Sequence, residues 1–283
     1  MVRKGGPAKR CEDGRECGLI KISGYQLFAI TFLFQLGTTV IFGFASGVGR
    51  DAWIVTLMSA AIGILLIRLY VSLMKMNEGL TLVEWYPRQF GKWIGLPIAW
   101  LYPLLFLFDA GRIVGDLRDL IPTTLLPTTP PLVVTVLFLL VVVYGLYLGL
   151  ENLSRVGEFL VPVIFLLFAI EIAMLAFSRI IEPKYVKPLL WEGWGPVLDA
   201  VFPEGITQTY GETIAFAMIW TSVNRPERIW RHTLLATLLS SLVFLVFDLL
   251  SITIFGGVLY ERSVYPYFTL TGMVNIGGFI TNV

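Results

Sequence analysis

The sequence predicts an all-α polytopic membrane protein. Of its 283 residues, 56% are hydrophobic and only 14% are charged, and the mean hydropathy is +0.78. A soluble domain carries about 25% charged residues. Several apolar runs reach the roughly 20 residues that a helix needs to cross a bilayer core. A lone span in lipid must satisfy its own backbone hydrogen bonds, so these runs are expected to be helices. None alternates apolar and polar residues as a barrel strand does.

We predict seven spans, over residues 24–46, 52–74, 94–118, 132–150, 157–177, 199–222 and 233–254. The sequence LPTTPP at 126–131 predicts a stiff outer turn, because its prolines disfavour helix. Trp191 and Trp194 lie in an outer loop and suit the headgroup level. Residues 265–280 are mixed in polarity and interrupted by glycine, which favours an interfacial or re-entrant outer helix over an eighth span.

The distribution of basic residues predicts a cytoplasmic N-terminus, because inner segments of membrane proteins are enriched in Lys and Arg. Residues 1–22 are polar and lack the features of a cleaved signal peptide, so they are expected to be a retained cytoplasmic tail. The basic residues of the chain are dispersed between the spans, so no nucleic-acid partner is indicated. With this orientation the inner segments hold Arg3, Lys4, Lys9, Arg10, Arg15, Lys21, Lys75, Arg88, Lys92, Arg155, Arg225, Arg228 and Arg231, and the outer segments hold Arg50, Arg179, Lys184, Lys187 and Arg262.

No pattern of catalytic or metal-ligating residues is found. Cys11 and Cys17 lie in the tail at a spacing typical of no zinc site, and we interpret them as reduced thiols. His232 is the only histidine, which argues against a histidine metal site or a catalytic triad. No Ser/His pairing or nucleotide-binding glycine loop is present on the spans. We therefore expect no enzyme activity, no metal and no cofactor.

Two of the predicted spans contain polar, flexible residues at their midpoints. The first has QLGTT at residues 35–39, and the sixth has TYGET at 209–213. At mid-depth, freed backbone groups must meet protein, water or ligand rather than lipid. The two spans run in opposite directions and begin five spans apart, so they would open two inverted five-helix halves. Paired interrupted helices of this kind indicate a transporter-type binding site. The alternative is that Gly37 and Gly211 only allow close helix packing.

Charged residues inside the spans have both functional and structural interpretations. Glu212 lies beside the predicted break, where burying its charge costs about 2.5–3.5 kcal/mol. It is either an ion, proton or gating site, or a side chain that ties down an unwound turn. Asp109, Arg112 and Asp116 share one helix face and can neutralise one another. Asp109 is the deepest of the three and is a candidate to face a central cavity.

The chain resembles the B subunits of bacterial spore germinant receptors, a family of endospore germination permeases in the amino acid/polyamine/organocation superfamily. The similarity covers residue 20 onward. It rests on the ordered segments ISGYQLFAITFLFQLGTTV, KMNEGLTLVEWYPRQFGKWIG, LPTTPP, GLENLSRVGEFLVP, KPLLWEGWGPVL and YGETIAF.

The resemblance implies a LeuT-like inverted-repeat fold in the spore inner membrane. It also implies that the protein senses a small germinant such as an amino acid, together with companion A and C subunits. Residues 23–178 would form the first five-helix repeat and 179–283 an incomplete second repeat. The ligand-binding positions that it implies are Gly37, Thr38 and Thr39 in the first span, Phe108 and Asp109 in the third, and Tyr210, Gly211, Glu212 and Thr213 in the sixth.

Two features depart from the family pattern. Thr209 and Tyr210 stand where the family often has an aromatic residue and a proline. The family has ten spans, whereas seven and an outer helix are predicted here, so we expect a fragment or a truncated reading frame. An ion-coupled secondary transporter for amino acids remains the alternative to a receptor, because both would use the same site.

Overall fold

The computed structural model describes residues 21–178, 180–273, 275–276 and 280–281. Most of the predicted cytoplasmic tail, including Cys11 and Cys17, lies outside the described residues. Within the described part, five helical stretches are long and apolar enough to cross a membrane: Gly24–Phe42, Ser46–Met76, Leu82–Thr124, Pro131–Phe177 and Pro226–Arg262. The protein is an all-α polytopic membrane protein, as the sequence predicts.

The first span is interrupted at Gly37. Helix α1 (Gly24–Leu36) begins at a capping box, in which the Ser23 side chain accepts a hydrogen bond from the Gln26 backbone and the Gln26 side chain accepts one from the Ser23 backbone. It ends at Gly37, whose backbone angles (φ 35°, ψ −135°) strongly favour glycine. The short helix α2 (Thr39–Phe42) follows, and then a 3₁₀ segment, η1 (Ser46–Asp51), leads into α3 (Ala52–Met76).

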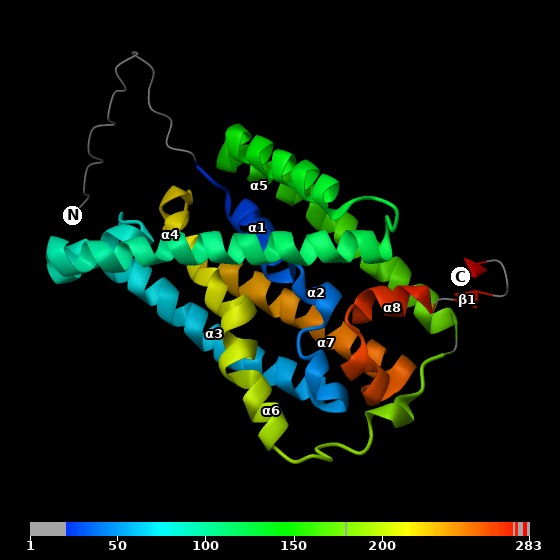
Figure 1. The fold of residues 1–283 in the computed structure, drawn as a ribbon. Helices are drawn as coiled ribbons and strands as arrows, with labels where there is room; N and C mark the ends of the chain where they lie inside the picture. Colours follow the sequence, from blue (N-terminus) through cyan, green and yellow to red (C-terminus); the bar gives the residue numbers. More distant parts are fainter. Residues whose placement is uncertain (1–20, 179, 274, 277–279, 282–283) are drawn as a thin grey trace.

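Two very long helices are each divided by a bend. Helix α4 (Leu82–Thr124) bends at Gly91, and helix α5 (Pro131–Phe177) bends at Gly149 (φ 82°, ψ 169°). At 1.5 Å per residue a straight α5 would be about 70 Å long, more than twice the hydrocarbon core of about 30 Å. Figure 1 shows the two arms of α5 folding back on each other. The arms correspond to the predicted spans 132–150 and 157–177.

The sixth predicted span, 199–222, is not a regular α-helix. After the short helix α6 (Gly195–Ala200) the chain forms π-helical turns, η3 (Val201–Gly205) and η4 (Thr207–Gly211). It then tightens into 3₁₀ turns, η5 (Glu212–Met218) and η6 (Trp220–Ser222). Thus only the hydrogen-bonding pattern changes at the position where a break was predicted.

The predicted break at Gly211 is wrong in its backbone angles. Gly211 itself is helical (φ −64°, ψ −44°), whereas Phe202 is extended (φ −127°, ψ 128°). A residue that precedes proline is disfavoured in the helical region, and Phe202 precedes Pro203. The chain therefore leaves helical geometry nine residues before the predicted position.

The C-terminal part contains the most central helix. After the turn η7 (Pro226–Arg228), α7 (Ile229–Arg262) runs through the middle of the molecule and bends at Gly256. It packs against α1, α3, η1 and the short 3₁₀ helix η2 (Pro183–Val186) (Figure 1). Helix α8 (Pro266–Gly272) is followed by a minimal antiparallel hairpin of β1 (Asn275–Ile276) and β2 (Ile280–Thr281). The outer helix predicted for 265–280 therefore ends at Gly272.

Two hydrophobic clusters hold the bundle together. The larger one joins α1, α3, α5 and α7 through residues such as Phe32, Phe168 and Phe247. The smaller one lies where α1 begins and η6 ends, around Leu27, Trp85 and Trp220. The facing surfaces of α1, η4, η5 and α7 also carry buried hydroxyl and amide groups.

Candidate functional site

The two interrupted segments, residues 24–42 and 195–222, lie against each other and run in opposite directions. Near one end, the Ile22 backbone N–H donates to the Ser222 carbonyl at 2.8 Å. Further along, the Gln35 amide donates to Thr213 Oγ1 at 3.0 Å, and the hydroxyls of Thr39 and Thr209 are 3.2 Å apart. The residue number rises along one segment as it falls along the other, so the pair is antiparallel.

Gln35 is the centre of a buried polar network and is only 1% exposed. Its amide nitrogen donates to Thr213 Oγ1 and to Thr237 Oγ1, both at 3.0 Å. Its amide oxygen accepts a hydrogen bond from Ser240 Oγ at 2.8 Å. A single side chain of α1 therefore connects η5 and α7 through neutral groups.

Tyr210 extends this network to a second part of α7. Its ring is fully buried, and its hydroxyl lies 2.8 Å from Ser241 Oγ. The ring packs on Gly63 of α3, where a Cβ atom would overlap it. The lack of a side chain at residue 63 thus lets Tyr210 lie against α3.

An ion pair joins the sixth segment to α4. Arg112 donates to Glu212 Oε1 at 3.0 Å and is 3.6 Å from Asp116. The predicted ladder of Asp109, Arg112 and Asp116 is therefore wrong in part, because the nearest partner of Arg112 comes from another segment. The pairing of Glu212 with Arg112 supports the structural interpretation of this glutamate. Its role in gating stays a prediction.

A cavity of about 620 Å³, which we call the vestibule, opens beside this ion pair. It extends from the end of α1 past α2 and η1 to the beginning of the sixth segment. Arg112 and Asp116 form part of its wall from α4. Its other polar side chains are Thr38, Thr39, Ser46, Glu204, Gln208 and Ser263.

The predicted site residues are placed unequally around the vestibule. Thr38 and Thr39 line it, directly after Gly37. Tyr210 and Thr213 are buried in the polar network, and Glu212 reaches the vestibule wall only through Arg112. The segments 24–42 and 195–222 thus contact each other beside the vestibule.

The two predicted positions on α4 are placed differently. Phe108 is 70% exposed, and Asp109 is half-buried. The vestibule is lined by Arg112 and Asp116, one and two turns further along α4. Phe108 and Asp109 therefore do not line the vestibule, and their role in binding stays a prediction.

The polar face of α7 was not predicted from the sequence. Thr233, Thr237, Ser240 and Ser241 recur every three or four residues and are buried. This spacing places them on one helix face, and that periodicity was available in the sequence. Hydroxyls in a spanning helix often bond back to the preceding turn, so the pattern alone did not indicate an interhelical contact.

Comparison with known proteins identifies the family. A family model described as "Spore germination protein" matches residues 21–283. The chain belongs to this family. No solved structure matches the chain. Within the described residues, no group of three His, Cys, Asp or Glu side chains is arranged to hold a metal ion.

Several relatives in this spore germination family are similar over much of the chain. Spore germination protein KB of Bacillus subtilis is 29% identical over 260 residues, which cover 92% of this chain and 70% of that protein. Spore germination protein A2 of the same organism is 29% identical over 153 residues, 53% of this chain and 41% of A2. Spore germination protein XB of Bacillus anthracis is 23% identical over 237 residues, 83% of this chain and 64% of XB. The matched part thus spans between two fifths and seven tenths of these relatives.

Proposed function

We propose that this spore germination protein is the germinant-sensing membrane subunit of a receptor. In this proposal a small solute such as an amino acid binds between the two interrupted segments. The observation that carries it is the antiparallel contact of these segments, which meet through Gln35 and Thr213 and through Thr39 and Thr209, with Thr39 also lining the vestibule. Its volume of about 620 Å³ lies within the usual range for small-molecule sites.

The chemistry of the site suits a solute that carries both charges. The end of α1 at Gly37 presents backbone carbonyls that have no further helical partner, and such carbonyls favour an ammonium group. Arg112 offers a guanidinium to a carboxylate, and Asp116 and Glu204 offer carboxylates to an ammonium. We propose that Gly37, Thr38, Thr39, Tyr210, Gly211, Glu212 and Thr213 bind the solute or hold the binding segments, with Phe108 and Asp109 as weaker candidates.

The architecture that we propose is LeuT-like, with residues 23–178 as one repeat and 179–283 as part of an inverted second repeat. The antiparallel contact of the first and sixth segments supports it. The protein would lie in the spore inner membrane with its N-terminus in the cytoplasm, and companion A and C subunits would respond to its conformation. Ligand binding then acts by shifting a conformational equilibrium.

The first test is germination of a strain that lacks the gene, against a panel of amino acids and sugars. A lost response to one solute identifies the germinant, and an unchanged response to all of them would contradict the proposal. Thr39→Val then removes a hydroxyl from the vestibule wall with little change in shape. Loss of one hydrogen bond of about 1.4 kcal/mol would raise the half-maximal germinant concentration about tenfold.

The matched control for Thr39→Val is Thr135→Val. Thr135 lies on α5, where its hydroxyl donates to the carbonyl of Pro131 in its own helix and bonds to no other described residue. We expect this control variant to have the same half-maximal germinant concentration as the parent protein. Equal sensitivity of Thr39→Val and the parent would remove the vestibule from the proposed site.

A secondary transporter for amino acids is the second candidate, and the interrupted segments favour it as much as a receptor. Uptake of the germinant into liposomes that contain only this protein, driven by an ion gradient, would support the transporter. Binding of the germinant without uptake would support the receptor.

A further inference from the structure

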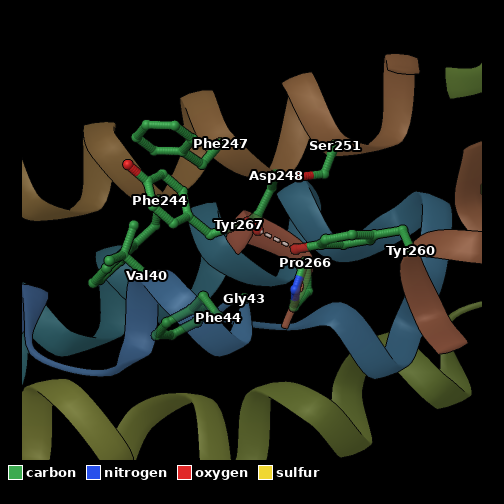
Figure 2. A pocket seen from close by; sticks show the side chains of 10 residues that line it. All are labelled: Val40, Gly43, Phe44, Phe244, Phe247, Asp248, Ser251, Tyr260, Pro266 and Tyr267. Carbon is green, nitrogen blue, oxygen red and sulfur yellow. Dashed lines mark hydrogen bonds between the residues drawn. The ribbon is translucent and has the colours of Figure 1, made fainter. Parts of the chain in front are cut away.

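Asp248 is a carboxyl group in the middle of the central helix α7, and it has no role in the site described above. It is only 2% exposed. Figure 2 shows it directed toward Tyr260, among the aromatic rings of Phe244, Phe247 and Tyr267. A charge at such a position is costly to bury unless it is paired or neutralised, so ionisable residues inside membrane segments usually serve a function.

Both oxygens of this carboxyl group accept hydrogen bonds from neutral hydroxyls. Thr56 on α3 donates to Oδ2 at 2.6 Å, and Tyr260 donates to Oδ1 at 2.5 Å. In the part of the chain that the structure describes, no Lys, Arg or His side chain forms an ion pair with Asp248. A cationic partner therefore does not hold this group in its charged form.

The two hydroxyl partners suit both protonation states of Asp248. A hydroxyl can donate to a carboxylate, and after rotation it can accept from a carboxylic acid. Thr56 can then direct its own hydrogen to the carbonyl of residue 52, one turn earlier in α3. An ammonium or guanidinium partner has donors only and could not make this exchange.

The cavity beside Asp248 restricts what can bind there. Its volume is about 10 Å³, roughly the space of one water molecule. Apart from Asp248, Ser251 and Tyr260, its lining is mostly aromatic or aliphatic. Hard metal cations take about six or more oxygen ligands, which this lining does not supply. A proton needs only one oxygen and a neighbouring hydroxyl.

A second buried acid lies on the other side of the same aromatic cluster. Glu171 of α5 is 8% exposed, and it accepts a hydrogen bond from Tyr267, which also lines the Asp248 cavity. Its other oxygen, Oε1, has no partner among the described residues. The remaining titratable or charged side chains on the described segments that contact α7 are Tyr25, Arg50, Asp51, Arg68, Tyr70, Lys75, Glu182, Lys184, Tyr185, Tyr210, Glu227 and Arg228, and those of α7 itself are Arg231, His232, Glu261 and Arg262.

The Asp248 cavity and the vestibule share a wall. Gly43 and Phe44 line both of them. The Tyr260 hydroxyl lies so close to Gly43 that a Cβ atom on this glycine would be 2.9 Å from it. The hydrogen bond between Asp248 and Tyr260 therefore lies next to the backbone where α2 ends.

We propose that Asp248 is a proton-binding site, and that its protonation changes the conformation of the Gly43–Phe44 wall of the vestibule. One carboxylate oxygen takes a proton from a hydronium ion, which is left as water, and the resulting carboxylic acid donates to Thr56 or Tyr260. Release reverses these steps and returns the proton to water. The site does not depend on the identity of the solute, nor on the choice between receptor and transporter.

Infrared difference spectroscopy of the purified chain in lipid nanodiscs tests this proposal. Between mildly acidic and mildly alkaline buffer, the parent protein should lose the C=O stretching band of a buried carboxylic acid. Asp248→Asn should remove that band. The matched control Glu151→Gln changes an exposed acid that pairs with Arg155 and should keep it. A band that is absent from the parent protein, or unchanged in Asp248→Asn, would overturn the proposal.

Tyr260→Phe covers the case in which Asp248→Asn does not fold. This variant keeps the carboxyl group and removes one hydrogen-bond partner, so the band should move to higher frequency. If the band does not shift in Tyr260→Phe, it belongs to another acid and the proposal is overturned. Loss of the band in Glu171→Gln would then identify that acid as Glu171. Because the readout is a vibrational band, it holds or fails separately from any test of germination.

Discussion

Gln35 makes three hydrogen bonds to hydroxyl groups at a place where lipid or hydrocarbon would otherwise be expected. Two of its partners lie on α7 and one lies on η5, so its amide connects three segments of the chain. Hydroxyls that lose a partner in a buried site pay the cost of desolvation without compensation. The stability of the contact of α1 with η5 and α7 therefore depends on this one side chain.

We expect Gln35→Leu to lower the free energy of unfolding by about 1–3 kcal/mol, because it leaves buried hydroxyls without a partner. The measurement is thermal unfolding of the purified protein in detergent. Asn152→Leu, which replaces an exposed side-chain amide on α5, should have little effect. Equal stability of both variants would show that the network does not stabilise the fold.

The ion pair between Arg112 and Glu212 can be tested by a double-mutant cycle with Arg112→Gln and Glu212→Gln. Because both side chains are partly buried, we expect a coupling energy of about 0.5–3 kcal/mol in the unfolding free energy. The exposed pair of Arg155 and Glu151 provides the control, where about 0–1 kcal/mol is expected.

Glu212→Gln should also alter germinant sensitivity, and an unchanged response would restrict Glu212 to a structural role.

At the scale of single elements, the two glycines of the predicted breaks behave differently. Gly37 has a positive φ, and a Cβ atom there would be 3.0 Å from the carbonyl oxygen of Phe34. Gly211 has helical angles, and its nearest neighbour would be 3.4 Å from an added Cβ atom. The interruption of the first segment thus requires glycine, whereas that of the sixth does not.

We therefore expect Gly37→Ala to lower stability by about 1–3 kcal/mol and to impair the response to germinant, because alanine is strained in this conformation. Gly211→Ala should be tolerated. Thermal unfolding and germination of spores that carry each variant provide the measurements. A fully responsive Gly37→Ala variant would show that the interruption can be rebuilt without glycine.

The bend at Gly149 is expected to be essential for topology. Its angles (φ 82°, ψ 169°) belong to a region almost restricted to glycine. Gly149→Val should therefore favour a straight α5 and misplace the loop at 125–130 relative to the membrane. Labelling of Thr128→Cys with a membrane-impermeant reagent, in a background without Cys11 and Cys17, measures its position. Gly145→Val, in the helical part of α5, is the matched control.

The sequence predicted the spans better than their internal geometry. The string QLGTT indicated the interruption of the first segment, because a glycine among polar residues at mid-depth is typical of a broken span. The extended residue in the sixth segment could have been inferred from Phe202 before Pro203. In contrast, the π-helical and 3₁₀ turns around Tyr210 lie against Gly63, 147 positions earlier in the chain, and nothing local in the sequence indicates this contact.

The candidate site was predictable only where it rests on local pattern. Thr38 and Thr39 follow the glycine directly, so their place in the vestibule follows from the break. The partners of Gln35 on α7 are more than 200 residues away, and nothing near Gln35 in the sequence indicates them. For the same reason, the pairing of Arg112 with Glu212 instead of Asp109 required the arrangement of helices in space.

At the scale of the whole molecule, the receptor and the transporter predict different behaviour in a reconstituted membrane. We expect binding of the germinant by the purified protein, seen as a rise in its unfolding temperature, without ion-driven accumulation in liposomes. A ligand at 100 times its Kd would add about 2.7 kcal/mol of stability. Accumulation against a gradient without any partner subunit would contradict the receptor and support the transporter.

The side-chain hydrogen bonds between the interrupted segments involve hydroxyls and one amide, whereas the contact beside them is an ion pair. Dissolved salt weakens attraction between charges and has little effect on neutral hydrogen bonds. When these hydroxyls separate, each must form a hydrogen bond to water instead. The separation of the segments therefore depends on how much water is available around them. Dehydration would therefore hold the neutral contact closed, and rehydration would release it, whatever the ionic strength.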